Sequence, residues 1–145
     1  MKLSSRREPG CDARGTTAIE FALVAPVFLM LIFGAIEYSR LLWTLNALQQ
    51  VAFDGARCMA IPQSSCAVGG SYNSTSTTTH ITQTANQWGL SLQTINLSQN
   101  VSCGGVSGFS QVQVSSNFIT PVPQIVLLTA AGTTLQATAC YPNNS

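Results

Sequence analysis

A chain of 145 residues has room for one small domain, with about ninety residues left for a soluble core once a membrane segment is set aside. All six basic and all five acidic side chains lie in residues 1–57, whereas 41 of the 88 residues in 58–145 are Ser, Thr, Asn or Gln and none is charged. This composition excludes electrostatic binding of nucleic acid by the second part of the chain, and an apolar fraction of 46% favours a folded structure over disorder.

The N-terminal part predicts a short cytoplasmic leader over residues 1–15 and a transmembrane helix over residues 16–38. Residues 21–36 are all apolar or small, and 23 helical residues span roughly 34 Å, enough to cross a hydrocarbon core of about 30 Å. Four basic and two acidic side chains precede Thr16, whereas two basic and three acidic ones follow. The positive-inside bias therefore places the N-terminus in the cytoplasm and exports the rest, with Tyr38 and Trp43 near the outer interface.

A cleavable secretory signal is the main alternative for this apolar segment. The segment is longer than a usual signal core of about 7–15 residues, and no small-x-small cleavage pattern follows it before the helical pattern resumes. A lipoprotein anchor at Cys11 is disfavoured because no apolar stretch precedes that cysteine. The sequence therefore favours a helix that stays in the membrane.

Two residues of the span are unusual in lipid. Pro26 removes one backbone donor and predicts a local kink, which membrane helices tolerate. Glu20 places a carboxylate at the edge of the hydrocarbon. It either reaches back to the cytoplasmic headgroups or pairs with a cation that another chain presents.

The residues around this acid read RGTTAIEF and resemble the type IV prepilin family. In that family a basic leader ends in Gly, a membrane peptidase cuts after it, and a Glu five residues on meets the new amine of a neighbouring subunit. The resemblance implies cleavage between Gly15 and Thr16, and it gives Glu20 the role of pairing with a neighbour. An amine and a carboxylate that are each costly alone in lipid become tolerable as a pair.

Over a longer stretch, residues 14–60 resemble the TadE-like pseudopilins of the tight-adherence (Tad, or Flp) pilus. The similarity is concentrated in Arg14, Gly15, Glu20 to Leu23, Pro26, Gly34, Glu37, Arg40, Ala47 to Gln49, Ala56 and Arg57. The resemblance implies processing by a prepilin peptidase, single-pass insertion in the inner membrane and a periplasmic C-terminal domain. It also implies a minor role in assembling or priming the pilus, together with other pilin-like subunits and the inner-membrane assembly platform. Whether the protein enters the fibre or stays at its base is left open.

Beyond the membrane span the helix is expected to continue, giving about forty helical residues in all. Its apolar side chains recur at steps of three and four residues, at Leu41, Leu45, Leu48, Ala52 and Ala56. We expect this stripe to pack against a sheet rather than to form a partner groove. Glu37 with Arg40 and Asp54 with Arg57 are expected to form i,i+3 pairs at the surface.

The rest of the chain, within an exported domain over residues 39–145, predicts a small sheet after a short helix. A loop rich in Ser, Gly and Thr runs to about residue 77, and a helix over 77–89 follows with Ile81, Ala85 and Trp88 on one face. Period-two patterns then predict strands over 92–103, 111–118 and 133–141. The expected fold is α+β, with one long helix packed on an antiparallel three-stranded sheet, and the pilin resemblance implies the same layout.

The five cysteines fit this topology. Cys11 lies in the leader, and the exported cysteines are Cys58, Cys66, Cys103 and Cys140. Four cysteines allow three connectivities, and spacing alone leaves all three open. We favour Cys58–Cys66, which closes a short loop at the helix end, with Cys103–Cys140, which joins two strand ends.

Neither a cofactor nor an active site is expected. A zinc site built from these cysteines and His80 is disfavoured because the chain has no C-x-x-C pair and exported cysteines are usually oxidised. Beyond Arg57 the ionisable side chains are His80, cysteines and tyrosines, which supply no acid–base pair. The sequence therefore predicts a non-enzymatic protein. The alternative to a pseudopilin is a membrane-tethered module whose charge-free face binds carbohydrate or another surface polymer.

Overall fold

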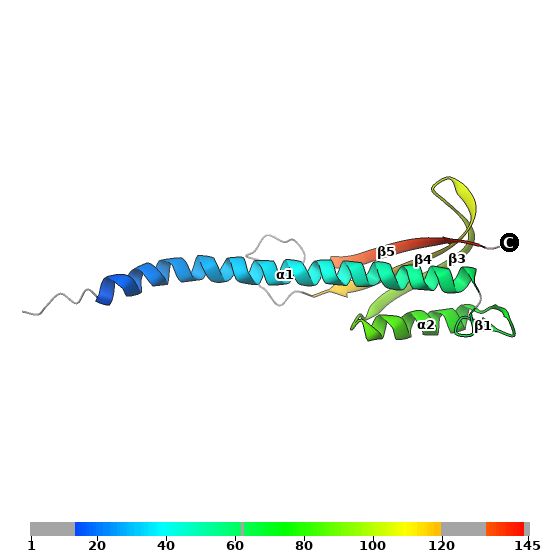
Figure 1. Ribbon diagram of the computed structural model, residues 1–145, viewed down its shortest axis with the longest axis horizontal. Coiled ribbons are helices and arrows are strands. Elements are labelled where there is room, and N and C mark those ends of the chain that lie inside the picture. The colour runs from blue at the N-terminus through cyan, green and yellow to red at the C-terminus, as the bar shows by residue number, and fades with distance from the viewer. Residues whose placement is uncertain (1–13, 62, 120–132, 144–145) are drawn as a thin grey trace, which may run out of the picture.

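The computed structural model describes residues 14–61, 63–119 and 133–143, so residues 1–13 of the predicted leader over residues 1–15 lie outside them. The elements in chain order are α1 (Arg14–Ala60), β1 (Ala67–Val68), β2 (Ser71–Tyr72), α2 (Ser74–Gln87), β3 (Leu92–Cys103), β4 (Val106–Phe118) and β5 (Thr133–Pro142). Figure 1 shows α1 projecting far beyond a small domain built from its own second half, α2 and a sheet. The predicted α+β class is confirmed.

The α1 helix is a single element of 47 residues that continues through Pro26. Its first part has no other described element beside it, whereas its second part packs against β4, β5 and α2 (Figure 1). Leu48, Ala52 and Ala56 of the predicted apolar stripe are fully buried, and Val51 joins them. The stripe is therefore part of the domain core, as the sequence predicted.

The main sheet is antiparallel with the order β3-β4-β5. The register determines which side chains face the core: Val112 of β4 lies opposite Leu97 of β3 and Ala139 of β5. The predicted bounds of β3 are confirmed, but β4 begins five residues earlier than predicted. Gly104 and Gly105, both at positive φ, make the turn, while Gly108 lies inside the strand with a φ of 90°.

The edge strand β3 is irregular at its far end. Its register with β4 shifts between Leu92 and Thr94, between Ser98 and Val101, and again before Cys103. Asn100 adopts a φ of 55°, a left-handed conformation that asparagine tolerates better than most residues. The Asn100 side chain accepts a hydrogen bond of 3.0 Å from Asn143 Nδ2, which ties the end of β5 to this bulged segment.

The α2 helix runs back along α1 in the opposite direction (Figure 1). It begins three residues earlier than predicted because Asn73 caps it, accepting a hydrogen bond of 2.9 Å from the Ser76 N–H. Ile81 and Ala85 are buried as expected, but Trp88 follows the helix and is exposed, so its predicted place on the buried face is wrong. The paired strands β1 and β2 occupy part of the segment that was predicted as loop.

Hydroxyl groups take the place of charges in the interior of this domain. Ser115 shares a hydrogen bond of 2.6 Å with Thr94, and Ser116 donates one of 2.8 Å to the carbonyl of Ser91. Such partners offset the free energy that an unpaired buried hydroxyl would cost. Burial also raises the pKa of the Tyr72 hydroxyl, so that this group stays protonated well above neutral pH.

Two disulfides join Cys58 to Cys66 and Cys103 to Cys140, the pairs that the sequence favoured. The first links the end of α1 to the start of the β1–β2 hairpin, with a Cα–Cα distance of 5.8 Å. The second joins the two edge strands across β4, with a Cα–Cα distance of 6.6 Å. Strands separated by a third one normally lie about 10 Å apart, so β3 must bend toward β5 at this end.

Candidate functional site: the N-terminal helix

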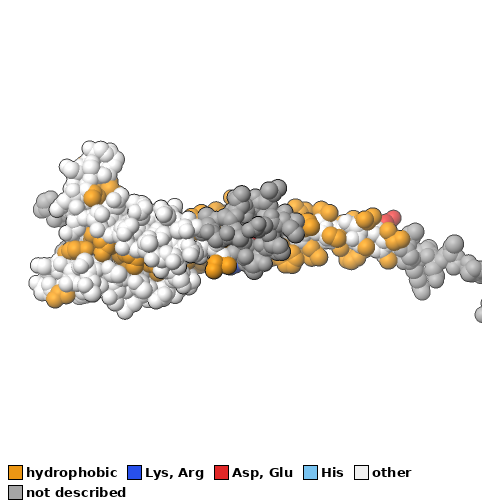
Figure 2. Space-filling model, turned by 180° about the vertical axis from the view of Figure 1, so that it is seen from behind, with side chains coloured by type: hydrophobic (Ala, Val, Ile, Leu, Met, Phe, Trp, Pro, Cys, Tyr) orange, Lys and Arg blue, Asp and Glu red, His pale blue; other side chains and the backbone are white. Residues whose placement is uncertain are grey.

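The first half of α1 exposes apolar side chains over its whole circumference. Figure 2 shows this part of the helix as an apolar rod that projects from a largely white, uncharged domain. The most hydrophobic window of the helix has a mean hydropathy of 2.4, and none of it is buried. Side chains such as Phe21, at 74% exposed, have no cover from the described residues. This segment is a candidate single-pass membrane span.

The predicted cleavage and pairing residues lie at the start of this helix. Gly15 and Thr16 fall in the first turn of α1, and their side-chain surroundings lie outside the described part of the chain. Glu20 follows Thr16 by four residues, about one helical turn, and is exposed. Among the described side chains, Glu20 forms no ion pair. The helix thus presents, at one end of an apolar surface, a carboxylate that has no ion-pair partner among the described side chains.

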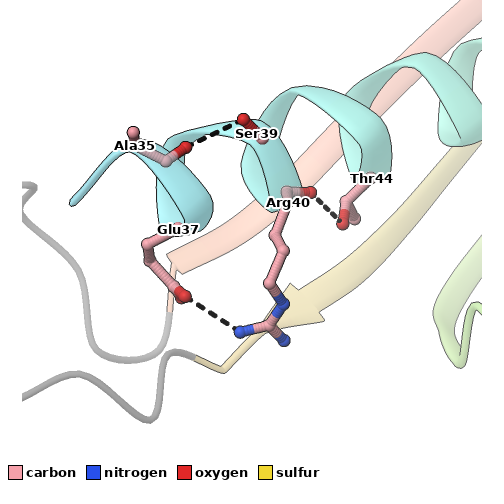
Figure 3. A network of polar contacts seen from close by, with 5 residues as sticks. All are labelled: Ala35, Glu37, Ser39, Arg40 and Thr44. Atoms are coloured by element: carbon pink, nitrogen blue, oxygen red, sulfur yellow. Dashed lines mark hydrogen bonds and ion pairs between the residues drawn. The ribbon is translucent and has the colours of Figure 1, made fainter. Parts of the chain in front are cut away.

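A second acid lies where the apolar segment meets the folded domain. Glu37 Oε2 accepts a hydrogen bond of 2.9 Å from the guanidinium of Arg40, and the two side chains are 10% and 49% exposed (Figure 3). The same guanidinium lies 5.7 Å from the centre of the Phe118 ring, at the end of β4. The i,i+3 pair is confirmed, but the expectation that Glu37 lies at the surface is wrong.

The other oxygen of this carboxylate, Glu37 Oε1, is buried and has no partner among the described residues. Hydroxyls on the same stretch of helix are satisfied locally. Ser39 donates to the carbonyl of Ala35 and Thr44 to that of Arg40, at 2.8 Å and 2.9 Å (Figure 3). Back-bonding of this kind lets a helix carry small polar side chains next to lipid without leaving donors unpaired.

The second predicted i,i+3 pair does not form as expected. Asp54 pairs with His80 of α2, with 2.9 Å between Oδ2 and Nε2. Since a carboxylate can only accept, the His80 Nε2 carries the proton. Arg57 is exposed on the outer side of α1. The pairing with Arg57 was wrong because the antiparallel α2 helix brings a nearer donor to Asp54.

His80 also lies beside the first disulfide. A ring nitrogen of His80 and the sulfur atoms of Cys58 and Cys66 lie within 4.8 Å of one another, a spacing that a metal site would need. The two sulfur atoms are bonded to each other, however, and metal ligation by cysteine requires thiolates. The arrangement is a histidine packed at a disulfide, and it ties α2 to the end of α1.

The sequence did not predict the contact between the two tryptophans. The ring centres of Trp43 on α1 and Trp88 after α2 lie 5.8 Å apart, at an interplanar angle of 57°. The two tryptophans are 45 residues apart in the sequence, so no periodic pattern could predict that they would meet. Only the antiparallel course of α2 brings the two rings together.

Comparison with known proteins bears on this helix. A family model described as TadE-like protein matches residues 15–57, which contain the Gly15–Thr16 bond, Glu20 and the Glu37–Arg40 pair. No curated protein and no solved structure matches the chain. The match covers most of α1, and the sheet domain lies beyond it. Residues 15–57 are therefore a TadE-like segment, and this similarity links the chain in general terms to the Tad pilus.

Proposed function

We propose that the chain is a minor pseudopilin that acts in assembly or priming of a tight-adherence pilus. A prepilin peptidase would cut between Gly15 and Thr16, and the product would remain in the inner membrane with its domain in the periplasm. The observation that supports this role best is the exposed Glu20, without an ion-pair partner among the described side chains, on a bare apolar helix.

The physical basis is the pairing of two charges inside lipid. Cleavage would give Thr16 a free amine, and an isolated amine or carboxylate in hydrocarbon costs several kcal/mol. Glu20 follows Thr16 by four residues, so the two groups are about 6 Å apart along the helix axis. Two parallel subunits displaced by about that distance would bring the acid of one to the amine of the other. The same contact would fix their relative height in a growing assembly.

This role sets the expected partners. Other pilin-like subunits would supply the amine, the peptidase would read the leader, and the inner-membrane assembly platform would extract the helix. Because residues 58–145 are uncharged, long-range electrostatic steering of the domain is absent. The specific recognition of neighbours in the membrane would then rest on α1.

The first test combines N-terminal mass analysis with a charge variant. The membrane-extracted protein is expected to start at Thr16. Glu20→Ala is expected to be inserted and cleaved normally but to abolish pilus assembly, because the neighbour's amine loses its counter-charge. Glu8→Gln, which changes an acid in the leader, is the matched control and is expected to assemble normally. A native protein that starts at Met1, or normal assembly by Glu20→Ala, would contradict the proposal.

A tethered binding module is the second candidate, favoured by the row of hydroxyls on α2. A groove of about 420 Å³ is lined by Ser74, Thr75, Thr78, Thr79, Thr82 and Gln83. The hydroxyls of Thr78, Thr79 and Thr82 donate to carbonyls one turn earlier in the helix, so they are left mainly as acceptors for a ligand. The test is polysaccharide binding by the uncleaved full chain in nanodiscs. Binding that is lost in the variant Thr75→Val/Gln83→Leu would favour this function over that of a pseudopilin.

A further inference from the structure

We propose that the end of the domain nearest the apolar segment rests on the periplasmic face of the bilayer that α1 crosses, where Trp43, Trp88 and Arg40 contact phospholipid headgroups. This inference rests on the membrane anchoring in the proposed function, and it adds a contact between the folded domain and lipid. The partner is the bilayer that α1 crosses, through the phosphate and carbonyl layer of its outer leaflet.

The fold gathers several chain segments at this end of the domain. The α2 helix returns along α1 and delivers Trp88, while β4 runs in the same direction and ends at Phe118 (Figure 1). Trp88 contacts Trp43, and Phe118 lies under the Arg40 guanidinium. Ile119, the next described residue, is 75% exposed. Aromatic and apolar side chains from three separate elements thus meet beside the carboxyl end of the predicted span.

The depth of these side chains follows from helix geometry. Trp43 lies five residues beyond Tyr38, the end of the predicted span, which corresponds to about 7.5 Å along the axis. The polar layer on each side of a bilayer is about 5–8 Å thick. Trp43 therefore lies at headgroup level, and Trp88, with its ring centre 5.8 Å away, is held at a similar level by the fold.

The two indole rings suit this environment. Trp43 is 61% exposed and Trp88 is 40% exposed, although they touch each other. Within the described part of the chain, neither indole N–H donates a hydrogen bond. An indole with an apolar body and an unused donor is favoured where hydrocarbon meets the carbonyl and phosphate groups of lipids.

Arg40 supplies a cation at the same level. One of its N–H groups bonds Glu37, and a guanidinium has further donors in a planar array that matches phosphate. A shallow groove of about 590 Å³ runs past it along α1, lined by Ala35, Ile36, Ser39, Arg40, Trp43 and Thr44. The groove is apolar toward the span and carries the charge toward the domain. This order matches a phospholipid, with its acyl chain beside Ala35 and Ile36 and its phosphate at Arg40.

Continuity with the span favours lipid over a protein partner. A second protein could reach this surface only by entering the headgroup layer beside the helix. Arg40 has the charge opposite to that of lipid phosphate, and the next arginine along the chain, Arg57, lies nearly five helical turns farther along α1. The surface thus combines an apolar rim, indoles and one cation at the depth where a bilayer ends.

Tryptophan fluorescence tests this proposal directly because the chain has two tryptophans and both lie on the proposed surface. The full chain is reconstituted in phosphatidylcholine vesicles, with or without lipids brominated close to the headgroup. Trp43→Phe leaves Trp88 as the only emitter. Its emission is expected to fall in the brominated vesicles, and to fall less when the bromines lie near the acyl-chain ends. Unchanged Trp88 emission in both kinds of brominated vesicle would overturn the proposal.

Two controls separate this outcome from failure of the anchor. Trp88→Phe leaves Trp43 on α1 itself, so its quenching reports insertion of the helix alone. Quenching of Trp43 without quenching of Trp88 would reject the resting domain and leave the proposed function intact, whereas loss of both would reject the anchoring too. Val106→Trp in a chain without the native tryptophans places an emitter about 40 Å from Phe118 along β4, at an exposed turn. This emitter is expected to be unaffected by bromine.

Discussion

Gly55 of α1 has no room for a side chain because Ile81 of α2 packs against it. A Cβ at this position would lie 2.7 Å from Ile81 Cδ1 and 2.8 Å from its Cγ1, and Ile81 is itself buried. Overpacking of this kind costs about 1–3 kcal/mol, whereas replacing a helical Gly by Ala gains about 1 kcal/mol. Gly55→Ala is therefore expected to lower the free energy of unfolding by about 1 kcal/mol in urea titrations of the detergent-solubilised chain.

A double-mutant cycle tests whether Ile81 is the cause. Ile81→Ala removes both clashing atoms and is expected to cost about 2–5 kcal/mol by itself. In that background Gly55→Ala should become neutral or stabilising, because only the gain in helix propensity remains. An equal cost of Gly55→Ala in both backgrounds would mean that the contact with Ile81 does not set it.

At the same scale, the sequence predicted residues whose role depends on their neighbours along the chain. Gly15, Thr16 and Glu20 form a local motif whose role stays a prediction, whereas the spacing of Glu37 and Arg40 was enough to predict their ion pair, which is confirmed. Asp54 was assigned the wrong partner because His80 lies 26 residues away and comes near only when α2 packs on α1. The burial of Glu37 could not be predicted either, since burial depends on tertiary packing and not on local spacing.

At the scale of elements, the two disulfides close loops of very different length. The paired cysteines are separated by 8 residues in Cys58–Cys66 and by 37 in Cys103–Cys140. Loop-closure entropy then predicts a stabilisation of about 2.5 kcal/mol for the first and about 4 kcal/mol for the second. Cys103→Ala/Cys140→Ala is therefore expected to lower the free energy of unfolding more than Cys58→Ala/Cys66→Ala. The reverse order would show that the packing of the buried first disulfide outweighs loop length.

Elements with a clear period were predicted from the sequence, and those without one were not. The alternation in residues 92–103 gave the bounds of β3, and the three- and four-residue steps gave the buried face of α1. Glycine usually weakens a strand, but Gly108 lies within β4 at positive φ, and β4 therefore starts earlier than expected. The two-residue strands β1 and β2 are too short to show any alternation.

At the scale of the whole molecule, the domain is held together almost without charge. Its core is apolar, its buried hydroxyls are paired with other hydroxyls, with the backbone or with the Asn143 side chain, and residues 58–145 contain no Lys, Arg, Asp or Glu. The partly exposed Asp54–His80 pair contributes at most about 1 kcal/mol. The urea midpoint in neutral detergent is therefore expected to change little between low salt and roughly 1 M NaCl, where the Debye length is about 3 Å. A steep dependence on salt would contradict this account.

The overall arrangement was predictable because a strongly apolar segment and a period-two region each specify their own structure. The end of the domain beside the apolar segment was not predictable, because Trp43, Trp88 and Phe118 come together only through reversals of the chain. The fold class thus follows from local patterns, whereas the surface proposed to rest on lipid follows from tertiary structure.

The bulged end of β3 has a consequence for solubility. Edge strands usually avoid joining the edges of other molecules by carrying lysine or proline, and β3 has neither. In β3, the register shifts and the left-handed Asn100 take over this task, because they bend the edge and disrupt pairing with a strand of another molecule. Removing Asn100 would straighten β3 and leave a flat, uncharged edge strand. A strand of a second molecule could pair with this edge, and repeated pairing would produce fibrils.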